Sequence, residues 1–435
     1  MNALVSYFND VKSASKNAKL FMLTNVLFGI LLGATWTGLG IIIENGFNPK
    51  VLGTALAMHT LGMAVAAVPV GRGANKFGYK TVLGFGTIVG AICLVLNGFV
   101  GSIMILYALN FIFGLAQGVY EVLPAPFMNA NTSEKQRSSV MAVMFGLYWT
   151  AVTLITKTSG NIIEYFQGGF GISELMAYKY YTFVAAGIGL LGLIPILAMD
   201  NVKVGNIKKK LEKSTSIMDD LKLLKNKEVA TYLFYMVFIG LGAGLFTPFF
   251  ANFFKNGFGL EPTLVGNILS IQYLAMVIGM FLCPLLVKKF GQVITLGAMS
   301  LASVPFMLVI VNSDQFGSSM VGVLTFAFFM RSGLMNLAMP VMYNLPLEFV
   351  DEDKRAPLAG LQALFSSGTR TLSSFIAGYV MMIPTFNVGR FILNGYRIPY
   401  YIAGVLYAIA SVILIKSFVK KYNRPGKSVD QEVAA

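Results

Sequence analysis

The stretch Lys76-Phe77-Gly78 separates two long apolar runs, and 213 residues later the chain carries Lys289-Phe290-Gly291 between two further runs. A shift of 211 residues likewise places Asn45-Gly46-Phe47 on Asn256-Gly257-Phe258. Leu and Val coincide easily by chance in apolar sequence, whereas polar loop tripeptides do not. The chain is therefore predicted to contain two copies of one unit, each built from several apolar segments.

Composition indicates that these segments cross a membrane. The 435 residues are 56% hydrophobic and 12% charged, with a mean hydropathy of +0.70, whereas soluble domains are about 25% charged. A membrane-spanning helix needs about 20 apolar residues. Twelve spans are predicted: 18–43, 49–70, 81–99, 102–128, 138–163, 177–199, 229–254, 262–287, 292–312, 318–344, 357–384 and 398–419.

The spans divide six and six. Residues 1–199 are predicted to form an N-terminal six-helix bundle, 200–228 a cytoplasmic linker, 229–420 a C-terminal bundle and 421–435 a cytoplasmic tail. Six spans separate equivalent positions, so the copies are parallel repeats about an axis along the membrane normal. Apolar residues in the Lys-rich linker suit a helix on the membrane surface. Most of the 33 Lys and Arg residues fall on the linker side, which predicts that both termini are cytoplasmic.

The loop between spans two and three carries Gly71, Lys76, Gly78 and Lys80, with Asn75 and Tyr79 between them. This pattern resembles the cytoplasmic signature loop of the major facilitator superfamily, although that family usually has Asp at position 75 and a basic residue at position 79. With the repeat, the resemblance covers nearly the whole chain and is that of a bacterial, efflux-like member. It implies an all-α integral membrane protein with the major facilitator fold. For the loop itself, a gating role and a simple positive anchor are the two interpretations.

Charged residues inside spans are costly and mark functional positions. Glu121 lies inside span four, Arg331 in span ten and Arg370 in span eleven. The resemblance implies that spans four and ten line the transport cavity. Arg331 and Arg370 are candidates for binding an anionic group, because guanidinium matches carboxylate and phosphate geometry. Glu121 is the candidate proton-coupling residue, and a structural ion pair between Glu121 and Arg331 is the alternative.

Further candidates for the substrate site are uncharged. Asn25, Gln117 and Asn336 are amides in apolar spans, where each needs a hydrogen-bonding partner. Trp36 is an aromatic residue that could stack on a substrate. His59 is the single histidine, and a packing hydrogen bond is favoured over a proton relay.

These features predict a secondary carrier that moves a small organic solute, possibly anionic, across the plasma membrane by alternating access and coupled to protons. A multidrug efflux antiporter, an electroneutral anion exchanger and a channel are the alternatives. No enzyme activity is expected, because the spans contain no Asp and no zinc-binding His pair, and the chain lacks a phosphate-binding loop. We expect no cofactor, no metal and no nucleic-acid partner. The expected partners are the small-molecule substrate and the lipid bilayer, and the expected state is a monomer.

Overall fold

The computed structural model describes residues 9–200, 221–389 and 391–425. Almost all of these residues are helical, and they form two compact units. Unit 1 comprises residues 1–213 and 259–270, and unit 2 comprises residues 214–258 and 271–435. The predicted linker at 200–228 and tail at 421–435 lie largely outside the described residues.

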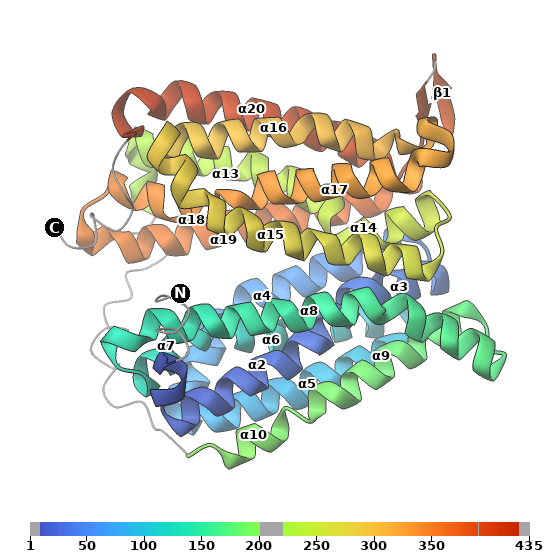
Figure 1. Cartoon of the computed structure of the whole chain (residues 1–435), viewed down its shortest axis with the longest axis horizontal. Helices are drawn as coiled ribbons and strands as arrows, with labels where there is room; N and C mark the ends of the chain where they lie inside the picture. Colours follow the sequence, from blue (N-terminus) through green and yellow to red (C-terminus); the bar gives the residue numbers. More distant parts are fainter. Residues whose placement is uncertain (1–8, 201–220, 390, 426–435) are drawn as a thin grey trace. The chain divides into compact units, whose positions relative to one another are not determined.

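After a short helical stretch at residues 9–13, the described part of unit 1 runs through a series of further helical segments (Figure 1). They are α2 (Lys16–Ala34), the π-helix η1 (Thr35–Leu39), α3 (Gly40–Gly46), α4 (Pro49–Phe77), α5 (Tyr79–Phe99), α6 (Ile103–Val122), α7 (Pro124–Asn131), α8 (Glu134–Phe170), α9 (Glu174–Leu190) and α10 (Leu193–Ala198). Polar N-cap residues begin several of them. The Asn48 side chain accepts a hydrogen bond from the Val51 amide at 2.9 Å, and Ser133 forms a capping box with Gln136.

Unit 2 contains the remaining elements, and α15 begins in unit 1. They are η2 (Leu221–Lys225), α13 (Lys227–Phe246), η3 (Thr247–Phe249), α14 (Phe250–Asn252), the π-helix η4 (Phe253–Gly257), α15 (Pro262–Phe290), α16 (Gln292–Val311), η5 (Ser313–Ser319), α17 (Met320–Leu337), α18 (Met339–Asn344), η6 (Leu345–Phe349), α19 (Glu352–Val380), β1 (Phe386–Val388), β2 (Phe391–Leu393) and α20 (Ile398–Tyr422). Strands β1 and β2 form an antiparallel hairpin that the sequence did not predict.

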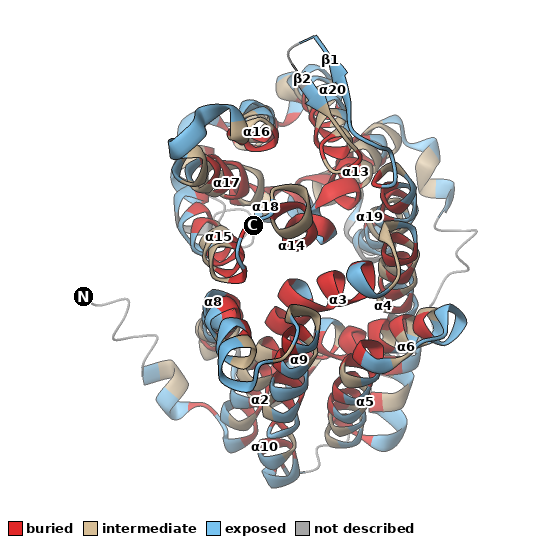
Figure 2. Ribbon diagram, turned by 90° about the vertical axis from the view of Figure 1, so that its right-hand side faces the viewer, coloured by how far each residue is buried: buried red, intermediate tan, exposed pale blue. Residues whose placement is uncertain are grey.

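Ten helices among the described residues are long and apolar enough to cross a membrane, and the bent α4 would add an eleventh. The 29-residue α19 falls at the remaining predicted span. The all-helical, multi-pass fold is therefore confirmed. Figure 2 shows α13 largely buried, whereas α20 exposes one apolar stripe. That stripe is Ile402, Val405, Ile409 and Val412, with spacing typical of a lipid-facing helix.

Matched glycines bring the same helix pair together in each unit. A Cβ on Gly33 of α2 would lie 3.1 Å from the Val152 carbonyl oxygen of α8. Its repeat counterpart Gly244, on α13, would meet the Arg370 carbonyl oxygen of α19 at 2.8 Å. Both distances are shorter than most Cβ contacts, so a side chain at either position would require its neighbour to move. The internal repeat seen in the sequence is therefore also a repeat of packing.

The first span of each unit is interrupted at the same repeat position. In unit 1, η1 occupies 35–39, and the 211-residue shift places those residues on 246–250, where α13 ends and η3 begins. Pro248 lacks an amide donor, which accounts for the break in unit 2. Residues 35–39 contain no proline, and hydroxyl groups accompany the break in unit 1 instead. The Thr35 and Thr37 hydroxyls donate to the Leu31 and Gly33 carbonyls, both at 3.0 Å.

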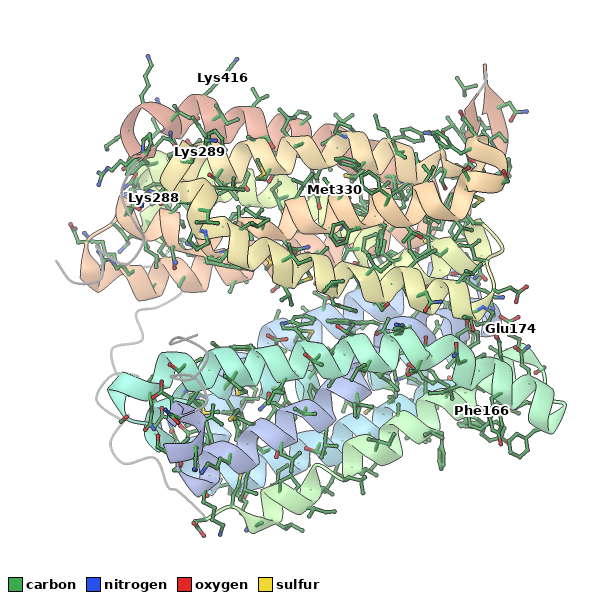
Figure 3. All side chains as sticks on the ribbon, viewed as in Figure 1. Phe166, Glu174, Lys288, Lys289, Met330 and Lys416 are labelled. Atoms are coloured by element: carbon green, nitrogen blue, oxygen red, sulfur yellow. The ribbon has the colours of Figure 1, made fainter. Side chains whose placement is uncertain are left out.

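Three lysines of unit 2 lie at one end. Lys288 and Lys289 close α15, and Lys416 lies near the end of α20, on the same side of the unit (Figure 3). The hairpin β1–β2 lies at the other end of this unit (Figure 1). This separation is the arrangement that a positive-inside topology requires.

Candidate functional site

Arg331 lies inside unit 2, surrounded by aromatic rings. Its side chain is 4% exposed, and its guanidinium carbon lies 4.6 Å from the Phe246 ring centroid and 5.3 Å from that of Phe250. Phe246 also contacts Tyr400, with ring centroids 4.8 Å apart. Cation–π attraction to these rings therefore replaces part of the hydration that the guanidinium loses on burial.

The charge of Arg331 is not neutralised by an acid. Among the described residues it forms no ion pair, and its Nε atom has no hydrogen-bond partner. The fully buried hydroxyl of Tyr407 lies within the electrostatic reach of both Arg331 and Arg370. That hydroxyl and the Tyr400 hydroxyl make no well-aligned hydrogen bond. The interior of unit 2 thus holds a positive charge and two hydroxyls with hydrogen-bonding capacity left over.

Arg370 is the accessible member of the arginine pair. It is exposed near the middle of α19, and its backbone packs against Gly244 of α13. No described residue forms an ion pair with it. A charged side chain at this depth does not face lipid hydrocarbon. Arg370 is therefore a charged residue within a predicted span that is not covered by other side chains.

The amides predicted for the site differ in how deeply they are buried. Asn336, on α17, is half-buried and donates to the Ser332 carbonyl at 2.8 Å. Asn25, on α2, is buried and donates to the Phe21 carbonyl at 2.9 Å. Both bonds run to the residue four positions earlier, so each amide uses one donor within its own helix and keeps its carbonyl oxygen available.

Gln117 and His59 approach one another where α6 packs against α4. Both are buried, and the His59 ring stacks on Phe113 at 5.0 Å between centroids. The imidazole interacts with the Gln117 amide, but neither His59 Nε2 nor Gln117 Oε1 has a partner with good hydrogen-bond geometry. Helix packing is the observed setting of His59.

Glu121 is exposed one turn beyond Gln117 on α6. It forms no ion pair with another described residue. A carboxyl group inside a span faces a bundle interior or a water-filled cavity. Glu121 and Arg370 are exposed charged residues within predicted spans of unit 1 and unit 2 respectively.

Trp36 is exposed at the second position of η1. The indole is 38% exposed and stacks on Trp149 of α8, with ring centroids 6.0 Å apart. Tyr148 meets Trp149 edge-on at 5.2 Å. The Thr37 hydroxyl, on the same π-helix, bonds to the Tyr181 hydroxyl of α9 at 3.0 Å. This bond fixes the backbone that presents the indole.

The loop predicted to gate transport is a tight helix-to-helix turn. Gly78 has φ of 87° and ψ of 159°, and its amide donates to the Ala74 carbonyl at 3.0 Å. Lys76 is exposed and Gly71 lies within α4. Lys80 donates to the Leu197 and Met199 carbonyls at 2.6 and 3.1 Å, at the end of α10. Lys80 therefore caps a helix, a role that its position in the motif did not reveal.

The second copy of this turn is fixed by different side chains. Gly291 has φ of 84° and ψ of 160°. Gln292 donates to the Tyr422 carbonyl at 3.1 Å, and Asn423 donates to the Phe290 carbonyl at 2.9 Å. In each unit the turn is thus bonded to the end of the last helix of that unit.

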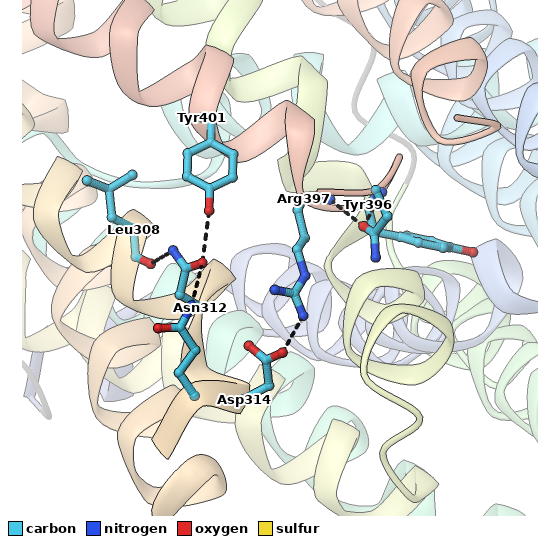
Figure 4. Close-up of polar contacts among 8 residues, drawn as sticks. Leu308, Asn312, Asp314, Tyr396, Arg397 and Tyr401 are labelled. Atoms are coloured by element: carbon cyan, nitrogen blue, oxygen red, sulfur yellow. Dashed lines mark hydrogen bonds and ion pairs between the residues drawn. The ribbon is translucent and has the colours of Figure 1, made fainter. Parts of the chain in front are cut away.

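Sequence reasoning missed a buried ion pair at the other end of unit 2. Arg397 Nη2 lies 2.6 Å from Asp314 Oδ2, and the arginine side chain is 6% exposed (Figure 4). Nearby, Tyr401 donates to Asn312 at 2.9 Å. Asp314 and Arg397 are 83 residues apart in the chain. No local pattern could have identified this pair.

Among the described residues, no three His, Cys, Asp or Glu side chains gather closely enough to hold a metal ion.

Known proteins resemble this chain in sequence and in fold. The Major Facilitator Superfamily family model matches residues 21–367 and again 232–434. An uncharacterised MFS-type transporter of Bacillus subtilis (strain 168), YddS, is 24% identical over 288 residues, which cover 64% of this chain and 65% of that transporter. The aligned part is thus slightly under two thirds of the relative.

Solved transporter structures share the fold. The nucleoside transporter NupG superposes with a TM-score of 0.72 at 15% identity, over 94% of this chain and 100% of that one. A D-xylose-proton symporter gives a TM-score of 0.70 at 15% identity, over 94% and 99% of the two chains. At this identity the likeness concerns the fold.

Proposed function

The chain belongs to the major facilitator superfamily of transporters, and on this premise we propose that it carries a small organic anion by alternating access. The observation that supports the proposal is the pair of cations in unit 2. Arg370 is exposed in mid-span and Arg331 is buried behind aromatic rings, and neither has an acidic partner among the described residues. A solute anion would supply the missing negative charge.

The two arginines would have different tasks. Arg370 can contact the solute directly, since its side chain is accessible. Arg331 adds a fixed positive potential from within the bundle, which low-dielectric surroundings make stronger than in water. Because both act on the Tyr407 hydroxyl, that hydroxyl is suited to orienting the anion between them.

Ligand-induced thermal stabilisation of the purified protein tests this proposal. We expect organic anions to raise the unfolding temperature of the wild type and to lose this effect in Arg370→Gln and Arg331→Gln. Saturation at a hundred times Kd stabilises a protein by about 2.7 kcal/mol. The matched control is Lys157→Gln, another exposed cation in a span. If lipophilic cations stabilise all four proteins equally and anions none, the anion proposal is wrong.

Proton coupling is proposed to occur through Glu121, an exposed acid in mid-span. A monovalent anion that moves together with one proton carries no net charge across the bilayer. This lowers the electrostatic cost of crossing it. In proteoliposomes with an internal pH dye, we expect the anion that stabilises the protein to drive proton entry. Glu121→Gln should abolish proton entry, whereas Asp351→Asn, outside the spans, should not. Anion exchange without proton entry in the wild type would favour the electroneutral exchanger.

Multidrug efflux is the second candidate, and one observation favours it. Unit 1 offers an exposed carboxylate, Glu121, and an aromatic pair, Trp36 and Trp149, which together suit a lipophilic cation. Lipophilic cations that stabilise the wild type but not Glu121→Gln would select this function.

We further propose that the protein is a monomer of the plasma membrane with both termini in the cytoplasm. The clustering of Lys288, Lys289 and Lys416 at one end of unit 2 supports the orientation (Figure 3). Labelling of single cysteines with a membrane-impermeant reagent in intact cells tests it. Position 289 should be protected and position 387, in the hairpin, should react.

A further inference from the structure

The hairpin of unit 2 presents an apolar face. Its register pairs Phe386 with Leu393 and Asn387 with Ile392. Residues paired across two strands share a face, and the face alternates along each strand. Phe386, Val388 and Leu393 therefore lie on one face of the hairpin, with Asn387 and Ile392 on the other. On the first face, Phe386 and Val388 leave 43% and 52% of their surface exposed.

A groove lies between this face and the first turns of α20, beside which the hairpin stands (Figure 2). Its volume of about 330 Å³ falls in the range of ligand sites, about 300–1,000 Å³. Its lining residues are Val388, Leu393, Ile398, Tyr401 and Ile402. The one polar atom in these five side chains is the Tyr401 hydroxyl, which donates to Asn312 at 2.9 Å (Figure 4). A polar solute would lose hydrogen bonds to water here and gain none, so the groove suits an apolar ligand.

The segment that joins the hairpin to α20 is held in place. Within it, Arg397 forms the buried ion pair with Asp314 at 2.6 Å, and its guanidinium carbon lies 5.7 Å from the Phe258 ring centroid. The Gly395 amide donates to the Ile383 carbonyl at 3.1 Å, just beyond the end of α19. These contacts fix the base of both walls, so the groove is preformed.

The groove continues the lipid-facing stripe of α20. Ile398 and Ile402 line the groove. Val405, Ile409 and Val412 follow at helical spacing on the same face and are exposed. On a membrane-spanning helix, an exposed apolar stripe of this kind contacts acyl chains. The apolar surface of the groove is thus continuous with a surface that lipid covers.

The chemistry of the hairpin indicates its depth in the membrane. It lies at the end of unit 2 opposite Lys288, Lys289 and Lys416 (Figures 1 and 3). A two-stranded hairpin has two strand edges, and edge backbone groups require water. Its apolar face instead favours hydrocarbon. Only the membrane–water interface provides both, and there the groove meets the acyl carbons nearest the glycerol.

From this geometry we propose that the groove binds one acyl chain of a phospholipid, in the leaflet at the hairpin end of unit 2. In the proposed orientation this is the outer leaflet. The site is distinct from the arginine pair, and the proposal rests on the membrane-spanning fold rather than on the charge of the solute. The buried ion pair thereby acquires a task, which is to hold a lipid site open.

Photoactivatable phospholipids test the site. The purified full chain is reconstituted in phosphatidylcholine vesicles that contain a trace of phosphatidylcholine with a diazirine in one acyl chain, either near the glycerol or near the terminal methyl group. Mass spectrometry locates the labelled residues. The probe near the glycerol should label Val388, Leu393 and Ile398 more than Val405 and Ile409, and the probe near the methyl group should show the reverse.

Matched variants separate the groove from bulk lipid. Leu393→Gln should lower labelling of the other groove residues roughly four- to fifteenfold, the value of one or two buried methylene groups. Ile392→Gln, on the other face of the hairpin, should leave it unchanged. Ile402→Gln, with Val405→Gln as its control, repeats the comparison on α20 in case Leu393→Gln disrupts the hairpin.

Three results would overturn the proposal. Equal labelling of groove and stripe in wild type and Leu393→Gln would mean that the hairpin meets bulk lipid alone. In detergent solution, displacement of the probe by less palmitate than phosphatidylcholine would assign the groove to a free fatty acid. Disulfide-linked dimers of Val388→Cys in membranes, without phospholipid labelling, would assign it to a second copy of the chain. The native cysteines, Cys93 and Cys283, are buried and should not interfere.

Discussion

In unit 1 the first span is interrupted at Thr35–Leu39, and in unit 2 the corresponding residues are 246–250. The second position of each interruption, Trp36 or Thr247, is exposed, and the first, Thr35 or Phe246, is buried. The chemistry differs. Threonine hydroxyls support a π-helix in unit 1, whereas Pro248 and a 3-10 turn break the helix in unit 2.

The comparison shows that the two copies of the repeat retain the position of the break and differ in the side chains around it. The break itself recurs, but unit 1 uses it to present an indole and unit 2 uses it to set Phe246 against Arg331. One unit thus presents an aromatic side chain and the other a positive charge. The two copies of one fold have acquired different side-chain chemistry at equivalent positions.

The largest expected effect comes from removing the buried charge. We expect Arg331→Met to lower anion affinity about 10- to 100-fold, because the anion loses the attraction of a unit charge that low-dielectric surroundings screen only weakly. Stability should stay the same or rise by about 1–4 kcal/mol, because an apolar side chain of similar size avoids the desolvation cost. Thermal unfolding and anion binding of the same preparation check this. A large loss of stability with unchanged affinity would make Arg331 purely structural.

A matched pair of glycines tests whether the two units pack equally tightly. We expect Gly244→Ala to destabilise unit 2 by about 1–3 kcal/mol, as overpacking does, since its Cβ would meet Arg370 backbone atoms at 2.8 and 2.9 Å. Gly33→Ala should cost less, because its nearest neighbour is a methyl group of Ile155. Unfolding temperatures in one detergent decide the order, and the reverse order would contradict it.

The π-helix of unit 1 should depend on its hydroxyls. Thr37→Val removes the bond to Tyr181 and should cost about 1 kcal/mol, the usual net value of a hydrogen bond. Tyr181→Phe should cost a similar amount, and the double variant less than the sum of the two. Thr247→Val, at the break of unit 2, is the control with little expected effect. Additive losses in the double variant would mean that the two hydroxyls do not interact.

The smallest effect is expected at the first turn. Lys80→Met removes two charged hydrogen bonds at a partly exposed site, and we expect a loss of about 0.5–1.5 kcal/mol with normal anion binding. Gln292→Leu removes the hydrogen bond to the Tyr422 carbonyl at the second turn, and we expect a similarly small loss of stability with normal anion binding. If Lys80→Met abolishes transport without lowering the unfolding temperature, the loop has the gating role that the motif suggested.

Sequence reasoning predicted the fold because its signals are long-range and repeated. Hydropathy placed the helices, and Lys76-Phe77-Gly78 with its copy predicted two turns whose glycines agree in φ within 3°. The candidate site was harder to predict. Periodicity does not show how a helix is rotated about its axis, so it could not tell that Arg331 turns inward while Arg370 is exposed. The break at 35–39 contains no proline, and therefore left no signal.

Gly78 and Gly291 also constrain how this chain can change over time. A residue with φ near 85° accepts almost nothing but glycine, whereas the next position holds Tyr79 in one copy and Gln292 in the other. Once a six-helix ancestor had been duplicated, its two halves could diverge in nearly every side chain and keep the same turn. In a saturation library of this chain that is selected for function, we expect glycine to be retained at positions 78 and 291. The surviving changes at these two codons should therefore be mostly synonymous.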